Sequence, residues 1–406
     1  MADIFWVGRQ RRRAMTRTLT VTTADTGDTI TVTTGGTKSV VVTPSTTNTT
    51  TTAAEIAAAC EASEEPEFEE ITWTSATNVV TAVGPEDGAP ITISKTDGGT
   101  NATVLATTVA ALSPNDLGDA ANYAGAALPA NLDRLVFQDG SVPVLYNLAA
   151  FTGVTYTVLR RDTYIGAIGL DDVNPNGYPE YRPTHLETAG ATIEIEGTDR
   201  DAPGQFRFKS TAGGAVTVTI RGGVPAPIGE EVVEVYATGA ASVYQIAGGA
   251  LAIAPNVGQT ATVGTLTATD ASLRIGSGVT LGSVAGTLLQ DVTALILSSW
   301  SNGLTLDGGE VTVGGAGTGA LTIDGGRLVW RSTANPANSP TVASGGTLDL
   351  TQAPKVLTIG GTVSLYAGAT LDDRNGRGGN YAAQCVRCTP QEVNWLLPNN
   401  KTLTLS

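Results

Sequence analysis

The chain has 406 residues, of which 41% are hydrophobic and only 15% charged, and its 49 glycines and 19 prolines divide it into short segments. Such frequent glycines and prolines exclude a protein built mainly of long helices and are typical of many short strands. The formal net charge of −15 argues against a nucleic-acid-binding protein, because binding a phosphate backbone requires a basic surface. Aromatic residues make up only 5% of the chain, so we expect a core of small side chains in closely stacked layers.

The first sixteen residues, 1–16, carry four arginines on an otherwise acidic chain: Arg9, Arg11, Arg12 and Arg13. The ordinary interpretation is a solvated tail, and the alternative is a docking arm that binds an acidic neighbouring subunit. The arginines follow a short apolar stretch and no apolar h-region comes after them, so we expect no secretory signal. No apolar run approaches the ~18 residues of a membrane span, so we expect no membrane insertion.

Residues 17–112 are expected to form a small α+β attachment domain. Alternation of Thr and Val in L-T-V-T-T, T-I-T-V-T and S-V-V-V-T predicts half-buried antiparallel strands. The stretch T-T-T-T-A-A-E-I-A-A-A-C-E-A-S predicts a helix with Thr51 or Thr52 as its N-cap and with Ile56 and Cys60 on one face. Four more strand patterns follow, from I-T-W-T to A-T-V-L-A-T, and predict a β-sandwich-like domain that carries one helix.

Residues 113–132 are irregular and rich in turn residues, and we interpret them as a linker. From 133 to 372 a turn and a strand recur with the pattern G-G-x-apolar-x-apolar. This recurrence predicts stacked coils, here a right-handed parallel β-solenoid. The second glycine of each unit is expected at the corner, because Gly reaches positive φ without steric cost and stacked corners leave little room for a Cβ. These glycines are Gly249, Gly278, Gly309, Gly326, Gly346 and Gly361.

The repeat is uneven, because successive corner glycines are 29, 31, 17, 20 and 15 residues apart. A solenoid tolerates insertions in its turns, since each coil contacts only its neighbours. A β-sandwich and a flat β-meander stay open as alternatives. Residues 373–406 are more polar and bulkier than the coils, and we expect them to form a C-terminal cap over the last open edge.

No constellation of residues predicts an enzyme, a metal site or a cofactor site. The only histidine is His185, and the sequence contains no G-x-S-x-G motif that would supply a serine nucleophile for it. Cys385 and Cys388 supply two ligands where structural zinc takes four, so we expect packed thiols or an opportunistic disulfide. The glycine cluster at 314–319 lacks the Asp of a calcium-binding repeat, and no helix follows that would hold a pyrophosphate. We therefore expect no catalytic, metal-binding or cofactor-binding residue.

Carboxylates near the loop D-D-V-N-P-N-G-Y-P-E-Y-R-P-T-H-L give the one enzymatic alternative, a polysaccharide depolymerase, because glycosidases use two such groups. They are Asp171, Asp172, Glu180, Glu194 and Glu196. A structural role is favoured, since an acidic protein carries carboxylates on many solvated faces. Four aromatic residues offer a carbohydrate-stacking face as an alternative to core or corner packing, which is favoured. These are Trp300, Trp330, Tyr178 and Tyr181.

Two segments resemble known virion proteins. The helix end A-A-A-C-E-A-S, then P-E-F, I-T-W-T and P-I-T-I-S, resembles a module of bacteriophage and planctomycete phage-like virion structural proteins. The segment N-Y-A-G-A-A-L-P-A-N-L-D-R-L-V-F is similar to the opening coil of many β-helical surface proteins. Pro129, Asp133 and Phe137 match that pattern, and Tyr123 stands where it has Trp. The resemblance covers about residues 50–370 and implies a virion-associated protein, with no functional residue to carry over.

We therefore expect a virion structural protein of the tail-fibre, spike or decoration type, which attaches by residues 17–112 and projects a solenoid for assembly or host contact. The expected partners are other copies of the chain, with a trimer favoured, other virion proteins and a host surface glycan. Nucleic acid is not expected, and the expected location is the virion or another extracellular surface. A bacterial surface adhesin that binds glycans and a depolymerase are the alternatives.

Overall fold

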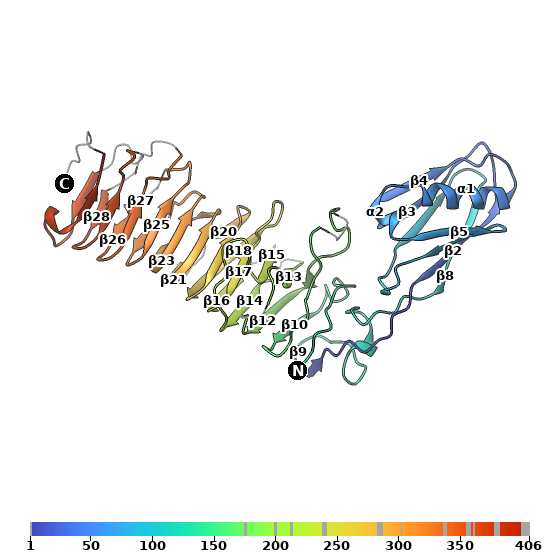
Figure 1. Ribbon diagram of the computed structural model, residues 1–406, viewed down its shortest axis with the longest axis horizontal. Helices are drawn as coiled ribbons and strands as arrows, with labels where there is room; N and C mark the ends of the chain where they lie inside the picture. The colour runs from blue at the N-terminus through green and yellow to red at the C-terminus, as the bar shows by residue number, and fades with distance from the viewer. Residues whose placement is uncertain are drawn as a thin grey trace.

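The computed structural model describes residues 2–398 apart from 174–176, 199–200, 212–213, 238–241, 282–286, 302, 336–338, 355–358, 360–361 and 377–381. The described chain forms two parts that meet in a V, a small antiparallel domain and a long stack of parallel strands (Figure 1). The predicted fold class, mainly β with an N-terminal α+β part and a parallel β-solenoid, is confirmed. Within the described ranges, no helix is both long and apolar enough to cross a membrane.

The N-terminal domain contains two antiparallel sheets, which match the Thr/Val alternation of its sequence. The four-stranded sheet has the order β5 (Thr72–Ala76), β6 (Val79–Val83), β2 (Thr16–Thr23) and β8 (Ala102–Val109). The three-stranded sheet has the order β4 (Lys38–Val42), β3 (Ile30–Thr34) and β7 (Ile93–Asp97). Alternate residues of β3 are buried, because one face of the sheet covers the domain core and the other faces outward.

The long helix α1 (Thr49–Glu61) begins earlier than predicted. Its N-cap is Asn48, whose side-chain oxygen accepts hydrogen bonds from the backbone N–H groups of Thr50 at 2.9 Å and Thr51 at 3.2 Å. The prediction that Thr51 or Thr52 caps the helix was therefore wrong. Asn is among the strongest N-cap residues, and its extended backbone places the amide oxygen over the open N–H groups.

The buried face of α1 is the predicted one. Ile56 and Cys60 are both fully buried in the domain core. Burial raises the pKa of the Cys60 thiol to about 12, so the thiol stays protonated and packs as a small apolar group. A short helix, α2 (Pro66–Glu69), follows and was not predicted.

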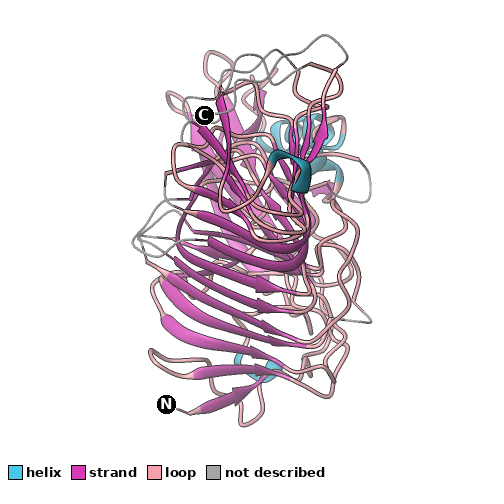
Figure 2. Cartoon of the chain, turned by 90° about the vertical axis from the view of Figure 1, so that its left-hand side faces the viewer, coloured by secondary structure: helices cyan, strands magenta, loops and turns pink. Residues whose placement is uncertain are grey.

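The second part is one parallel sheet wound into coils, and Figure 2 shows its strands stacked along the length of the molecule. The first strand row contains β9 (Arg134–Phe137), β10 (Thr155–Arg160), β12 (Gly190–Glu196), β14 (Val216–Arg221), β16 (Ser242–Ala247), β18 (Ala261–Thr269), β24 (Leu321–Ile323), β26 (Thr341–Val342), β28 (Thr362–Leu365) and β30 (Ala382–Cys385). The second row contains β11 (Leu186–Thr188), β13 (Phe206–Ser210), β15 (Val233–Ala237), β17 (Ala250–Ile253), β19 (Ser272–Ile275), β25 (Arg327–Trp330), β27 (Thr347–Asp349), β29 (Thr370–Asp372) and β31 (Asn394–Leu396). β21 (Thr287–Ile296) and β23 (Leu304–Val313) run through both rows, and β20 (Val279–Leu281) and β22 (Ser299–Trp300) form a short third one.

Register between coils places equivalent residues directly above one another. Ile220, Ile246 and Ala268 occupy successive rungs of the first row and all point into the core. Trp300 and Trp330 also lie in this core, with ring centroids 5.8 Å apart in an edge-to-face arrangement. The core is thus a set of continuous apolar ladders, mainly of Val, Leu and Ile with large aromatic side chains among them, so the expectation of a core of small side chains was wrong.

The outward residues of the first row form a second continuous ladder, which we call the threonine face. Its central line is Glu194, Thr219, Gln245, Thr267, Leu288, Thr305, Thr322, Thr341, Ser364 and Gln384. Successive members Leu288, Thr305 and Thr322 are 17 residues apart in sequence. Leu159 and Glu194, which also pair, are 35 apart because residues 161–185 form a long insertion. The uneven repeat therefore reflects loop length, and the register of this line is kept from coil to coil apart from a bulge between Ser242 and Val243 at the start of β16.

Two of the predicted corner glycines show why the corners need glycine. Gly309 has φ +75°, and a Cβ built on it would lie 2.0 Å from the carbonyl oxygen of Val292 in the preceding coil. Gly326 has φ +66°, and its Cβ would lie 2.4 Å from the carbonyl oxygen of Gly309. Successive corners therefore pack backbone against backbone, where any side chain would collide.

The other predicted corner glycines divide into two kinds. Gly249 also has positive φ, at +79°. Gly278 and Gly346 lack positive φ, but a Cβ there would lie 2.1 Å and 2.6 Å from a carbonyl oxygen of the coil before. At these two positions close approach, and not backbone conformation, requires glycine. Gly361 lies outside the described residues.

The two ends of the solenoid are built from segments that the sequence did not assign to it. Residues 3–5 of the predicted arm form β1 (Asp3–Phe5), which pairs in parallel with β9 and makes the first rung. Trp6 is buried and packs edge-to-face on Tyr123, with ring centroids 5.4 Å apart. At the other end, β30 and β31 pair with β28 and β29, so the described part of the predicted cap adds one more coil.

We predict that replacing Gly309 by alanine destabilises the solenoid by at least about 1–3 kcal/mol, because the left-handed conformation and the approach to Val292 both disfavour a Cβ. The matched control is Gly153→Ala, where no atom lies within 4 Å of the added Cβ. Thermal and denaturant unfolding followed by circular dichroism measure both variants. Equal stability of the two variants would contradict the stacked-corner geometry.

Candidate functional site

The insertion between β10 and β11 is the feature that connects the two parts of the protein. It contains the loop that the sequence singled out, and its last residues contact the end of α2 in the N-terminal domain. Its earlier residues lie over the outward side of the second strand row. The candidate site is therefore a joint between the two parts of the protein.

The centre of the joint is Glu70, the C-cap residue of α2. Its carboxylate accepts a hydrogen bond from the Tyr181 hydroxyl at 2.9 Å and hydrogen bonds from both Nη atoms of Arg182 at 3.3 and 3.2 Å. Glu180 holds the same guanidinium from its other side, with Arg182 Nε 2.9 Å from Oε1. Arg182 is thus fixed between two carboxylates, one from each part of the chain, in the fork geometry that makes Arg–carboxylate pairs specific.

A second contact supports the joint. The Tyr146 hydroxyl donates a hydrogen bond to the carboxylate of Asp87, which belongs to the N-terminal domain. The Arg182 guanidinium lies 5.6 Å from the ring centroid of Tyr146 and 5.0 Å from that of Tyr181, within cation–π range. Burial raises the pKa of the Glu70 carboxyl, and the charge of Arg182 opposes that rise. The joint is therefore a partly dry polar cluster whose groups depend on one another.

Under the insertion, charged residues alternate along the second strand row. Arg207 and Glu234 are register neighbours on β13 and β15, with Nε 3.5 Å from Oε2. Asp171 of the insertion pairs with Arg207 at 2.8 Å, and Asn256 donates a hydrogen bond to Asp172 at 2.8 Å. These contacts fasten the insertion to the coils, because Arg207 and Asn256 of the coils each bind a carboxylate of the insertion.

His185 lies at the base of this cluster. Its Nδ1 is 2.8 Å from the hydroxyl of Thr184, and its ring packs edge-to-face on Tyr236 at 4.9 Å. Burial, together with the positive charges of Arg207 and Lys209, lowers the pKa of His185 to about 3. The imidazole is therefore neutral at physiological pH and acts as a packed polar group.

A buried ion pair joins the end of β10 to the segment that follows β12. Arg160 is 1% exposed, and its Nη2 lies 2.7 Å from Asp201 Oδ1. The guanidinium also donates a hydrogen bond to the carbonyl oxygen of Glu196 at 2.8 Å and lies 4.6 Å from the Phe206 ring centroid. This pair was missed from the sequence because its members are 41 residues apart in an irregular stretch.

Four of the five carboxylates proposed for a depolymerase have separate partners. Asp171 and Glu180 pair with arginines, and Asp172 with Asn256. Glu196 pairs with Arg161 at 2.5 Å, and Glu194 lies on the threonine face. A cavity of about 420 Å³ opens beside the insertion, with Ile165, Val173 and Pro203 on its apolar side and Asp171, Glu180 and Arg207 on its polar side. Its charged groups are already engaged within the chain.

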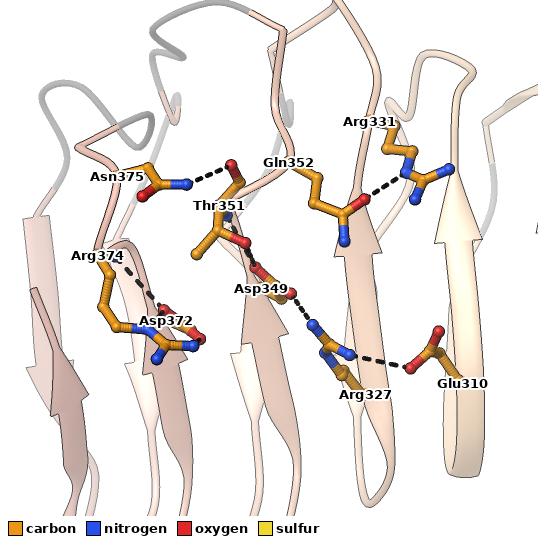
Figure 3. A network of polar contacts seen from close by, with 9 residues as sticks. All are labelled: Glu310, Arg327, Arg331, Asp349, Thr351, Gln352, Asp372, Arg374 and Asn375. Carbon is orange, nitrogen blue, oxygen red and sulfur yellow. Dashed lines mark hydrogen bonds and ion pairs between the residues drawn. The ribbon is translucent and has the colours of Figure 1, made fainter.

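A second polar ladder runs along the outward side of the last coils (Figure 3). Arg327 bridges Glu310, at 3.1 Å, and the fully buried carboxylate of Asp349. Asp349 also accepts hydrogen bonds from the Thr351 N–H at 2.8 Å and hydroxyl at 2.7 Å. Burial alone would raise the pKa of Asp349, but these hydrogen bonds and the charge of Arg327 outweigh it and lower that pKa.

The next rung repeats the arrangement. Asp372 is the register neighbour of Asp349 and pairs with Arg374 at 2.7 Å. Asn375 donates a hydrogen bond to the carbonyl oxygen of Thr351 at 3.1 Å, across the two coils (Figure 3). Stacked carboxylates would repel one another, and each is paired with an arginine: Asp349 with Arg327 of the preceding coil and Asp372 with Arg374 of its own coil.

The predicted docking arginines Arg9, Arg11, Arg12 and Arg13 are all exposed, and no ion pair joins them to another described residue. The backbone that carries them is fixed, because the Gln10 N–H donates to the Asn122 side chain at 2.9 Å and the Arg13 N–H to the Leu112 carbonyl oxygen at 2.9 Å. A docking role for these arginines stays a prediction.

The remaining predicted groups are not brought into one site. Cys385 and Cys388 are free and half-buried, and the Cys388 thiol donates to the Leu365 carbonyl oxygen. Tyr181 belongs to the joint, whereas Tyr178 is 39% exposed. Among the described residues, no three His, Cys, Asp or Glu side chains gather in a way that would hold a metal ion.

Comparison of the chain with models of protein families, with curated proteins and with solved structures found no match. The fold and the joint themselves define the class: a parallel β-solenoid protein whose N-terminal α+β domain is fastened to the first coils by a polar cluster.

We predict that Arg182→Ala loosens the joint, because it leaves Glu70 and Glu180 without their shared partner at a cost of roughly 1.5–3 kcal/mol per lost charged hydrogen bond. Small-angle X-ray scattering should show a broader distribution of interatomic distances, while the melting of the solenoid changes little. Arg331→Ala is the control, since Arg331 bonds Gln352 far from the joint. Identical scattering from the wild type and Arg182→Ala would contradict the assigned role.

We predict that stability falls as pH is lowered from about 6.5 towards about 3, in part because of His185. The folded-state pKa lies below the unfolded one, so only the unfolded chain takes up this proton in that window. The contribution approaches ~1.4 kcal/mol per pH unit. Denaturant unfolding of wild type and His185→Phe across this range should show a shallower slope for the variant. Parallel slopes would contradict a buried neutral imidazole.

Proposed function

We propose that this chain is a virion-associated structural protein of the fibre, spike or decoration type, anchored by its N-terminal domain and projecting the solenoid. The observation that carries the proposal is the joint. The Glu70–Arg182 contact and the Tyr146–Asp87 contact tie the two parts at one place. A projecting arm needs such a fixed attachment, because a rod on a flexible linker sweeps through many orientations.

The first rung supports the same role. β1 comes from the chain N-terminus, yet it pairs with β9, so the segment that follows it runs from the solenoid to β2 of the N-terminal domain. The polypeptide therefore passes between the two parts twice, once before β2 and once after β8. Two covalent crossings and a polar cluster resist bending better than one linker would.

The use of the carboxylates favours this proposal over a depolymerase. Retaining and inverting glycosidases alike need two carboxyl groups facing one substrate bond. Here Asp171, Glu180 and Glu196 are each committed to a different arginine. A glycan-binding adhesin stays the alternative, and the cavity beside Ile165 and Val173 is where a glycan would be tested first.

We predict that peptides of this chain co-purify with virus-like particles from the source culture through density-gradient centrifugation and are identified by mass spectrometry. Immunogold labelling with antibodies to the solenoid should decorate the outside of the particles. An envelope fraction of cells free of particles is the control. Recovery of the chain only in that fraction would favour the adhesin, and release of reducing sugars from host capsule by the purified chain would favour the depolymerase.

A further inference from the structure

The threonine face follows the first strand row from coil to coil. From Gln245 to Gln384 its central line carries no charged side chain, on a chain of net charge −15. Thr267, Thr305 and Thr322 on this line are half-buried in their own sheet and face outward between buried neighbours. An acidic chain thus keeps the central line of one long face neutral, and Asp307, two residues from Thr305 on β23, lies beside that line.

The spacing of this face fits one partner in particular. Its rungs follow the parallel strand register, so hydroxyl and methyl groups recur every ~4.8 Å along the solenoid. A second copy of the chain presents the same ladder with the same spacing, so contacts made on one rung are repeated on every other. Identical side chains on facing sheets interdigitate in this way, with the sheets ~10 Å apart.

The size of the face is sufficient for such a contact. The neutral line from Gln245 to Gln384 spans eight rungs, so this part of the face is roughly 35 Å long, and strands of about five residues make it roughly 17 Å wide. The product is roughly 600 Å² per copy, which reaches the ~1,200 Å² in total at the lower end of stable interfaces. Interface centres are also depleted in charged residues, as the central line of this face is.

We infer that the threonine face is the surface through which copies of this chain associate side by side. The contact is self-complementary, because it places the same face of each copy against a neighbour. This inference rests on the proposed fibre or spike role and names its partner. Because the mass in solution is measured without virus particles, the two proposals can fail independently.

The test is the mass of the purified full chain in solution, by multi-angle light scattering over a range of concentrations. We expect a multiple of 41.3 kDa for the wild type and 41.3 kDa for a double variant with Thr267→Lys and Thr305→Lys. The two lysines flank Leu288 in the middle of the face, so facing copies would bring like charges together. Thr293→Lys is the matched control, because Thr293 is exposed on β21 but outside the threonine face.

Circular dichroism establishes that each variant is folded, and chemical crosslinking gives an independent reading. In a background with Cys385→Ser and Cys388→Ser, a bismaleimide should crosslink copies that carry Thr305→Cys and leave those with Thr293→Cys as single chains. A monomeric wild type at all concentrations would overturn the inference. So would an oligomer that survives the double lysine variant, or a monomer that binds a neutral polysaccharide through this face.

Discussion

The in-register hydrogen bonding between successive coils is the constraint on which the rest of this protein depends. Because each strand pairs with its equivalent in the next coil, a residue type chosen at one rung is placed beside its counterpart at every rung. Ile220, Ile246 and Ala268 thereby form an apolar ladder inside, and Thr219 and Gln245 form a polar one outside. The same constraint brings corner backbones into contact and leaves no room for side chains there.

Stacking also decides where charge is tolerated. A charged residue on one rung lies only ~4.8 Å from its register neighbour, so like charges must be separated or paired. On the second row, Arg207 lies beside Glu234, and Arg327 takes up the charge of Asp349. In the insertion, Arg182 likewise pairs with carboxylates, and it thereby connects the coils to the N-terminal domain. The coils and the joint are therefore stabilised by the same kind of contact, a carboxylate bound by a planar guanidinium.

Much of the fold could be predicted from local pattern, because strand alternation and corner glycines are properties of neighbouring residues. Gly309 and Gly326 mark their corners in the sequence, and the Thr/Val runs before residue 50 mark their strands. The first rung could not be predicted, since the three residues of β1 show no periodicity and only the burial of Trp6 on Tyr123 reveals their place. The joint was equally hidden. Glu70 and Arg182 are 112 residues apart, and no local rule relates them, although the loop that contains Arg182 stood out by composition.

Amide hydrogen exchange of the intact chain, read by mass spectrometry, tests the stacked-coil account most directly. Peptides from β14, β16, β18, β21 and β23 should exchange slowest and at similar rates, because each of these strands is hydrogen-bonded on both sides. Peptides from the loop 222–232 should exchange quickly. Fast exchange in these central strands, with protection confined to the N-terminal domain, would contradict a continuous parallel stack.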